Sequence, residues 1–376
     1  MKTQQTLSPV YIMGGLRTPI GSYKGQFKSI KPEILGARVL DALYEQYPDV
    51  AEIICGNAVG TGGNIGRLTA LNSRYGEKTP AYTVDMQCAS AGAAIIQGFR
   101  AIRSGMADCV LAGGTESSSL QPLRTYAAGD DRIGEYMVAQ FSPQENDAQA
   151  MLKGAQRTIE KYDVSKEELD YWSLRSQQAA GRARDEGLLA PYVLDMGRDY
   201  VDESVRPGLS QRLLNRMKPV LGPGTLVTAG NACFTHDGAA FVALSNEVGP
   251  FKLVDAITFG GDPLYSPEGA WQATEQLLAK TGLTMDDIDA VEWNEAFAVI
   301  DVLFERNYKA YVDRYNQLGG ALAYGHPFGC SGAIILLHLM AALEYCNSRY
   351  GICAIAGAGG MGTAMLIERM EAVCDA

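Results

Sequence analysis

The chain of 376 residues contains only three histidines and no Cys-x-x-Cys pair, and no apolar run reaches the ~18 residues needed to cross a bilayer. Its eight cysteines are scattered, so neither a metal site nor a disulfide framework is indicated. The first residues are polar and then briefly apolar, without the hydrophobic stretch of a signal peptide. These shortages predict a cytoplasmic protein with reduced cysteines, no metal ion and no membrane segment.

Positive charge is also scarce. The sequence has 32 Lys and Arg against 43 Asp and Glu, a net charge of -11, which argues against nucleic acid or an anionic membrane as a partner. An anionic cofactor would need a local basic patch. Hydrophobic residues make up 47% and charged residues 20%, which is typical of a globular protein long enough for two or three domains.

The chain does contain a regular alternation of short apolar runs with stretches of helical length. This alternation predicts an α/β fold with mostly buried sheets. The clearest predicted strands are 10–13, 53–55 and 109–113, and the clearest predicted helices are 34–44 and 91–102.

The character of the sequence changes between about Ser118 and Gly224, where Gln, Asp, Glu, Arg and Tyr are frequent. This stretch has a helix-like part at 167–186 and a loop-like part at 195–210, and the α/β pattern resumes at 225–244. The predicted organisation is a first half at 1–118 plus 225–247, an insertion at 119–224, and a second half at 248–376.

Two segments far apart in the chain resemble each other. In the first, small residues after Cys88 lead into an apolar helix and then into a glycine-terminated strand from Cys109. In the second, the same order runs from Gly329 through a helix to a strand from Cys353. Such a duplication predicts two packed sheets related by a pseudo-twofold axis.

Cys88 is the first candidate for chemistry. The segment Gln-Cys-Ala-Ser-Ala-Gly-Ala places it at the N-terminus of a predicted helix, where peptide dipoles and free N–H groups favour a thiolate. Its small neighbours let a substrate approach the backbone closely. The alternative interpretation is a packed helix start with Cys88 as a small core residue.

His326 and Asn294 are the next candidates. His326 lies in a glycine-rich Gly-His-Pro loop, where a histidine can activate a thiol and donate toward an oxyanion. Asn294 opens the cluster Asn-Glu-Ala-Phe, for which the alternative is a simple helix cap. The glycine loop at 356–362 lacks the Lys-Ser/Thr of a phosphate loop, so it does not predict a nucleotide cofactor.

Together these clusters resemble the thiolase family over nearly the whole chain. Besides the Cys88 segment, the matching stretches are Arg-Thr-Pro-Ile-Gly from 17, Gly-Gly-Thr-Glu-Ser from 113, Ala-Gly-Asn-Ala-Cys from 229, Asp-Gly-Ala from 237, Asn-Glu-Ala-Phe from 294 and Gly-His-Pro from 325. The resemblance implies a thiolase fold, in which two duplicated α/β halves form a five-layered α/β/α/β/α arrangement with an inserted loop domain. It also implies a homodimer or homotetramer.

By this resemblance the protein is an acyltransferase of lipid metabolism, an acetyl-CoA C-acetyltransferase or 3-ketoacyl-CoA thiolase. Cys88 would take an acyl group, in the first place acetyl, from acyl-CoA. His326 would activate Cys88, and Asn294 would hold a water that completes an oxyanion hole with His326. The backbone N–H groups of Cys88 and Ala358 would form a second oxyanion hole.

Coenzyme A is implied only as a substrate, with no permanently bound cofactor, and its expected path runs through the insertion. Met151 falls where the family has a methionine beside the pantetheine, and Arg206 falls near its adenine-contacting arginine. Cys233 replaces the serine of the family's Ala-Gly-Asn-Ala-Ser segment. A partner enzyme of the same pathway is a further expectation.

The sequence departs from the family at its second acid/base cysteine, because Ala356 takes that position and a methyl group cannot carry a proton. Cys353 lies three residues earlier on a predicted strand and should face the other way. Cys330, in the Gly-His-Pro loop, is therefore the candidate substitute base. Three functions stay open: a thiolase with a substitute base, an acyltransferase that forms no carbon–carbon bond, and a non-catalytic CoA-binding scaffold.

Overall fold

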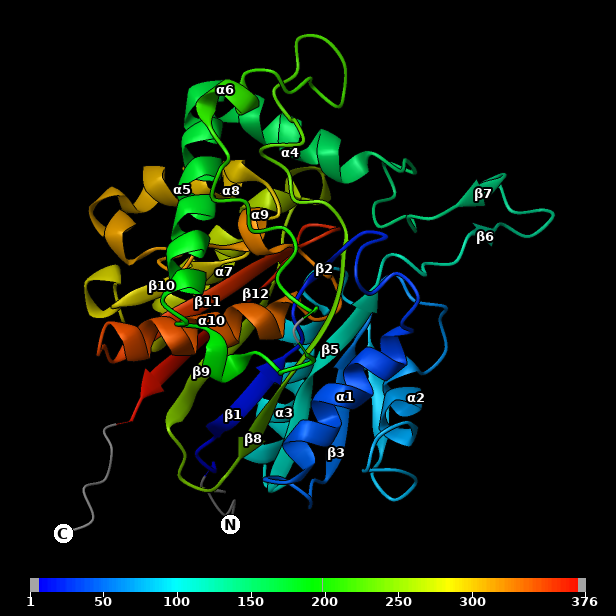
Figure 1. Ribbon diagram of the computed structural model, residues 1–376, viewed down its shortest axis with the longest axis vertical. Coiled ribbons are helices and arrows are strands. Elements are labelled where there is room, and N and C mark those ends of the chain that lie inside the picture. The colour runs from blue at the N-terminus through cyan, green and yellow to red at the C-terminus, as the bar shows by residue number, and fades with distance from the viewer. Residues whose placement is uncertain (1–6, 198, 371–376) are drawn as a thin grey trace, which may run out of the picture.

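The strands of both halves belong to one continuous sheet in the computed structural model, which describes residues 7–197 and 199–370 (Figure 1). The strand order is β10-β11-β12-β9-β1-β8-β5-β3-β4, with β2 paired to β8. The first half supplies β1 (Tyr11–Arg17), β2 (Gly21–Ser22), β3 (Glu52–Gly56), β4 (Ala81–Val84), β5 (Cys109–Ser117) and β8 (His236–Ser245). The second half supplies β9 (Phe251–Gly260), β10 (Ala290–Trp293), β11 (Tyr350–Gly357) and β12 (Met361–Arg369).

The two halves join at a short ladder. Strands β1 and β9 pair antiparallel at Tyr11–Lys252 and Ile12–Phe251. Beyond this ladder β1 pairs with β8 and β9 pairs with β12, so each strand otherwise belongs to its own half.

Helices form three layers around the two halves of the sheet. In the middle, α3 (Ser90–Arg103) and α10 (Ser331–Tyr345) pack against each other and against β5 and β11, respectively. The outer layer of the first half is α1 (Pro32–Tyr44) and α2 (Ile65–Leu71), and that of the second half is α7 (Gly269–Thr281) and α8 (Ala298–Tyr308). This order confirms the predicted five-layered arrangement. The prediction of two separate sheets is wrong, because the β1–β9 ladder joins the two into one.

The predicted elements are found with shifted ends. The predicted strands 10–13, 53–55 and 109–113 are β1, β3 and β5, and the predicted helices 34–44, 91–102 and 167–186 are α1, α3 and α5 (Lys166–Asp185). Short 3-10 helices complete the framework at η1 (Ala190–Tyr192), η2 (Pro263–Glu268), η3 (Met285–Asp287) and η4 (Lys309–Arg314). In the described ranges, none of the helices has the length and apolar character to span a bilayer.

The duplicated helices touch where two glycines meet. A Cβ added to Gly332 of α10 would lie 2.4 Å from the backbone nitrogen of Gly92 of α3, so the two helices could not come this close with a larger residue at position 332. Cys88 precedes α3 and the Gly-His-Pro loop precedes α10. This contact therefore brings both loops to the same end of the middle layer.

Residues 119–224 leave the layered body and return to it (Figure 1). Their hairpin of β6 (Arg124–Thr125) and β7 (Glu135–Tyr136) projects from the body, and their helices are α4 (Ala150–Lys161), α5 and α6 (Gln211–Leu214). A capping box starts α5, in which Ser165 and Glu168 each accept the other's backbone N–H. Because α5 packs on α8 and α9 (Ala321–Tyr324), these residues are seated over the second half.

Candidate active site

Cys88 lies on a tight turn immediately before α3. Its neighbour Gln87 has a φ of 53°, in the left-handed region that residues other than glycine rarely adopt. Asp85 Oδ1 accepts the Gln87 backbone N–H at 2.9 Å, and Ser90 Oγ accepts that of Met86 at 2.9 Å. These bonds hold a strained backbone of the kind that clusters at active sites.

Cys88 lines a cavity of about 410 Å³. Residues of the first half, the second half and the insertion contribute to its walls, which are largely apolar. The predicted site residues that line it are Cys88, His326, Ala358, Met151 and Cys233. The structure thus brings together residues that lie far apart in the sequence.

His326 is held in one tautomer by its neighbours. Its Nδ1 lies 2.6 Å from Ser331 Oγ, and that hydroxyl lies 2.8 Å from the carbonyl oxygen of Pro327. The carbonyl can only accept, so both contacts are hydrogen bonds only if Ser331 donates to Pro327 and His326 Nδ1–H donates to Ser331. The Nε2 atom of His326 is then unprotonated and able to take a proton.

Asn294 follows β10 and points to the same imidazole. Its Nδ2 lies 3.4 Å from His326 Nε2, and its backbone N–H donates to the carbonyl oxygen of Ala354 at 3.0 Å. The alternative interpretation of Asn294 as a helix cap is wrong, because α8 begins at Ala298 and its N-cap residue is Phe297. The amide therefore belongs to the site, where it can donate to the bare Nε2 of His326.

Burial, rather than the helix dipole, sets the protonation state of Cys88. Burial raises the pKa of the Cys88 thiol to about 12, and the backbone N–H groups of Cys88 and Ala358 lower it by less. Burial also lowers the pKa of His326 to about 3. The prediction of a favoured thiolate is therefore wrong for this enclosed site, in which both groups are neutral near pH 7.

The two N–H groups that favour the thiolate have a second use. Those of Cys88 and Ala358 lower the pKa of the Cys88 thiol, so they lie close to the sulfur and to the charge that would develop during its attack. Donors fixed in advance at such a position can act as an oxyanion hole. Within the described ranges, no cluster of three or more His, Cys, Asp or Glu side chains could hold a metal ion.

Cys330 is not brought to this cavity. Its Sγ donates to the carbonyl oxygen of Pro327 at 3.5 Å, its side chain is fully buried, and it is not among the described residues that line the Cys88 cavity. The structure thus gives no support to Cys330 as a substitute base. As predicted, Cys353 and Ala356 face opposite sides of β11: Cys353 packs with α3 and α10, and Ala356 packs with α7.

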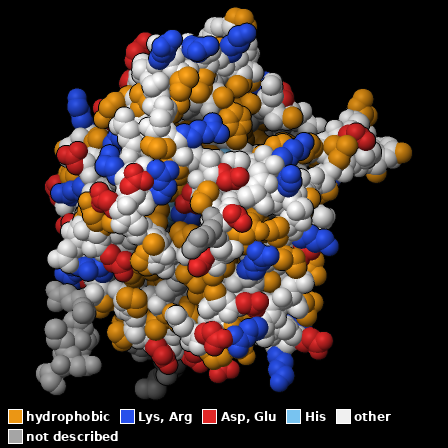
Figure 2. All heavy atoms as spheres, in the orientation of Figure 1, with side chains coloured by type: hydrophobic (Ala, Val, Ile, Leu, Met, Phe, Trp, Pro, Cys, Tyr) orange, Lys and Arg blue, Asp and Glu red, His pale blue; other side chains and the backbone are white. Residues whose placement is uncertain are grey.

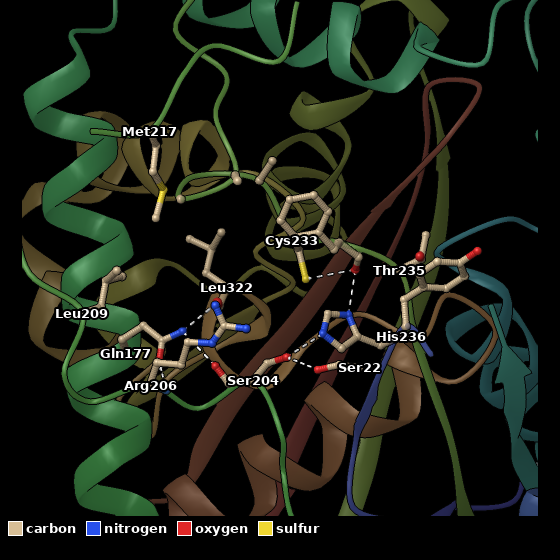
Figure 3. A pocket seen from close by; sticks show the side chains of 15 residues that line it. Ser22, Gln177, Ser204, Arg206, Leu209, Met217, Cys233, Thr235, His236 and Leu322 are labelled. Carbon is tan, nitrogen blue, oxygen red and sulfur yellow. Dashed lines mark hydrogen bonds between the residues drawn. The ribbon is translucent and has the colours of Figure 1, made fainter. Parts of the chain in front are cut away.

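A second cavity, of about 340 Å³, adjoins the first at Cys233 and Thr235, which line both. Figure 3 shows it beside α5, next to the segment that leads into β8. Arg206 lines this second cavity and not the first. Three polar side chains lie in a row along its wall: Ser22, Ser204 and His236.

Neither Ser331 nor His236 is predicted as a site residue from the sequence. Ser331 is the first residue of α10 and lies five positions after His326, a spacing that allows a contact across a helix start. His236 is one of only three histidines and precedes the Asp-Gly-Ala motif from 237. The signal for His236 was the rarity of histidine in this sequence, and the signal for Ser331 was its position after His326.

This site and fold define an enzyme that carries an acyl group on a cysteine, with a histidine as its base. The family model described as "Thiolase, N-terminal domain" matches residues 10–248, and the one described as "Thiolase, C-terminal domain" matches residues 251–369. The chain belongs to the thiolase family and is an acyltransferase. The resemblance seen in the sequence is thereby confirmed.

Relatives match over nearly their full length. VraB of Staphylococcus epidermidis is 33% identical over 378 residues, covering 95% of this chain and 98% of that protein. The Beta-ketoadipyl-CoA thiolase of Pseudomonas knackmussii is 32% identical over 397 residues, covering 96% and 99%.

Solved structures agree with these relatives. The Bacillus anthracis acetyl-CoA acetyltransferase has a TM-score of 0.90 and 27% identity, covering 98% of this chain and 100% of that chain. The human mitochondrial 3-ketoacyl-CoA thiolase in complex with CoA has a TM-score of 0.88 and 29% identity, covering 97% and 99%. These matches favour acetyl-CoA acetyltransferase or 3-ketoacyl-CoA thiolase activity over a scaffold role.

The raised pKa of Cys88 predicts how its alkylation depends on pH. Below the pKa the thiolate fraction rises about tenfold per pH unit, so labelling of Cys88 by iodoacetamide should climb without a plateau from about pH 7 to about pH 10. Peptide mapping after timed labelling measures the rate, and the exposed Cys346 reports on the reagent in the same sample. A plateau below pH 8 would instead indicate an ion pair with His326.

Proposed function

We propose that the protein transfers an acyl group, in the first place acetyl, between coenzyme A and Cys88. The observation that carries this proposal is that Cys88 and His326 line one cavity, while Ser331 engages His326 Nδ1 and leaves its Nε2 able to take a proton. A neutral imidazole can activate a neutral thiol by accepting its proton during the attack, without a pre-formed thiolate. The reaction is that of an acetyl-CoA C-acetyltransferase or 3-ketoacyl-CoA thiolase, in lipid metabolism.

In the first step, Cys88 Sγ attacks the carbonyl carbon of the thioester while His326 Nε2 takes the thiol proton. The charge on the carbonyl oxygen is met by the N–H groups of Cys88 and Ala358. The bond between the carbonyl carbon and the CoA sulfur then breaks, and the CoA thiolate takes the proton back from His326. Cys88 is left as a thioester.

The second oxyanion hole would face the other substrate. Asn294 Nδ2 lies 3.4 Å from His326 Nε2, so an amide donor and the imidazole point toward the same place. A water held by Asn294 would complete this hole together with His326 once its Nε2 carries a proton. Its use is in the step that follows acylation, when a second substrate meets the thioester on Cys88.

Removing the base tests the assignment. His326→Ala should slow acylation of Cys88 by acetyl-CoA by at least about 10²–10³-fold, because loss of a single oxyanion donor already costs that much. Intact-mass measurement follows the added acetyl group, and peptide mapping assigns it to Cys88. Cys88→Ser gives the background, and thermal melting checks that the folds are equal. Acylation at the wild-type rate in His326→Ala would refute the role of His326.

We infer that coenzyme A runs along the insertion at 119–224, past Met151 and Cys233 to Arg206. The two cavities adjoin at Cys233, Met151 lines the first, and Arg206 lines the second. Figure 2 shows Lys and Arg side chains at the top of the molecule, over α6, and the exposed basic residues between 206 and 218 are Arg206, Arg212, Arg216 and Lys218. They supply the local basic patch that an acidic chain needs to bind a polyanion.

Truncating Arg206 tests this path. Arg206→Ala should raise the KM for acetyl-CoA about tenfold, because one charge-assisted contact contributes about 1.5 kcal/mol or more, and should leave kcat within about threefold. Arg38→Ala is the matched control, since Arg38 is equally exposed but lies on α1, outside both cavities. An unchanged KM in Arg206→Ala would place the nucleotide end of coenzyme A elsewhere.

Ala356 restricts how a carbon–carbon bond can form or break. That chemistry needs a base near the α-carbon of the acetyl unit, and residue 356 offers only a methyl group. Cys330 is not among the described residues that line the Cys88 cavity, and its Sγ donates to the carbonyl oxygen of Pro327. Acyl exchange between thiols needs neither of them, because Cys88, His326 and the oxyanion donors suffice.

Deuterium uptake at the α-carbon of acetyl-CoA separates the two half-reactions. Uptake should be slow relative to acyl exchange in the wild type, unchanged in Cys330→Ala, and faster in Ala356→Cys, which restores a thiol at that position. Nuclear magnetic resonance of acetyl-CoA in heavy water measures it, with acyl exchange on the same samples as the control. Uptake that is rapid in the wild type and lost in Cys330→Ala would show that Cys330 is the base after all.

We also propose a homodimer or homotetramer in the cytoplasm. In the described sheet β4 is the last strand, and its Tyr82 side chain is exposed, so a second copy can extend the sheet there. Light scattering at micromolar concentration tests this assembly. The cytoplasmic location rests on the scattered cysteines of the sequence.

A further inference from the structure

His236 links the second cavity to the backbone of the catalytic histidine. It begins β8, its side chain is buried, and it lines the second cavity without being among the described residues that line the first (Figure 3). A parallel bridge between Thr235 and His326 lays the start of β8 beside the Gly-His-Pro loop. His236 is thus placed behind the site, where it touches no reacting atom.

The imidazole of His236 has a polar contact at each nitrogen. Its Nδ1 lies 3.1 Å from the backbone nitrogen of His326 and 2.7 Å from the carbonyl oxygen of Phe234. Its Nε2 lies 2.8 Å from Ser204 Oγ, which lies 3.0 Å from Ser22 Oγ. Figure 3 shows this row from Ser22 through Ser204 to the ring.

The ring also lies close against the loop that carries His326. A Cβ added to Gly325 would lie 2.4 Å from Cδ2 of His236, and Gly325 has a φ of 112°, so only glycine suits this position. The turn before His326 is therefore shaped around the imidazole of His236.

We propose that His236 is a positioning residue for His326: its Nδ1 accepts the backbone N–H of His326 and fixes the turn from which that imidazole reaches Cys88. The proposal rests on the function assigned to His326 above. It goes beyond that function by giving a role to a residue outside the catalytic cavity.

The two contacts at Nδ1 compete. The His326 N–H can only donate, so it requires a bare Nδ1. The Phe234 carbonyl can only accept, so it requires a protonated Nδ1. The bare form needs the ring proton on Nε2, from which it donates to Ser204, whose own hydroxyl then donates to Ser22. Burial lowers the pKa of His236, so the ring is neutral near pH 7 and carries a proton on only one of its two nitrogens. The contact with the His326 N–H requires that this proton be on Nε2, whereas a proton on Nδ1 would be donated to Phe234.

The backbone N–H of His326 needs a hydrogen-bond acceptor. His326 is almost fully buried, and a buried backbone N–H without an acceptor is unfavourable. If the turn relaxes to find another acceptor, the imidazole shifts relative to Cys88. A displacement of about 1 Å in a reacting group can cost about 10²-fold in rate.

Two substitutions separate the two ring nitrogens. In His236→Asn the amide oxygen falls near the place of Nδ1 and can accept the His326 N–H. In His236→Gln the longer amide reaches the place of Nε2 and Ser204, and the Nδ1 acceptor is lost. We expect kcat for acyl transfer to fall at least about tenfold in His236→Gln and to stay within about threefold of the wild type in His236→Asn.

The converse result overturns the proposal. If His236→Asn loses activity and His236→Gln keeps it, the residue acts through Ser204 and the second cavity. Equal activity in both variants also overturns it. If His236→Gln does not fold, His236→Asn decides alone, and a loss of kcat of tenfold or more in that variant refutes the role of Nδ1.

Hydrogen exchange gives a readout that is independent of catalysis. Mass spectrometry of a peptide containing His326 should show faster exchange by one amide in His236→Gln and wild-type exchange in His236→Asn. Unchanged protection in His236→Gln would refute the contact. Should wild-type Cys88 not be acylated by acetyl-CoA, the proposed function fails, whereas the exchange result still decides whether His236 holds His326.

Discussion

The contact between Gly92 and Gly332 is the constraint on which the site depends. The helices α3 and α10 meet at their first turns with no room for a Cβ, so their N-termini converge at one end of the middle layer. Cys88 precedes one helix and His326 precedes the other. A nucleophile and a base from duplicated halves are thereby placed in one cavity, and neither half could build the site alone.

Enclosure then decides the chemistry of the site. A helix N-terminus favours a thiolate by a fraction of a charge, but removing the sulfur from water costs more, and the pKa of Cys88 rises. The site therefore works with a neutral thiol and a neutral imidazole. The orientation of their hydrogen-bonding groups matters more than a pre-formed ion pair. Ser331 orients the ring of His326 through a hydrogen bond. The N–H groups of Cys88 and Ala358 are positioned to stabilise the negative charge of the transition state.

Local patterns predicted the fold and the central pair of residues well. The alternation of apolar runs predicted β1, β3 and β5, and the repeated order of loop, helix and strand predicted the equivalence of α3 and α10. Strand periodicity also predicted that Cys353 and Ala356 face opposite sides of β11. Two expectations failed or lost support, namely the thiolate at Cys88 and Cys330 as a base, because each depended on surroundings supplied by other parts of the chain.

The sequence by itself determined the layers, the duplicated halves and the presence of Cys88 and His326 in glycine-rich loops, because periodicity and small residues act over a few neighbours along the chain. Only the tertiary structure decided which way each side chain points and which proton it holds. Cys330 and His326 share one loop, yet one thiol is buried against Pro327 and one imidazole enters the cavity. His236 supports that imidazole from another strand, a contact invisible in sequence because it depends on two segments meeting in space.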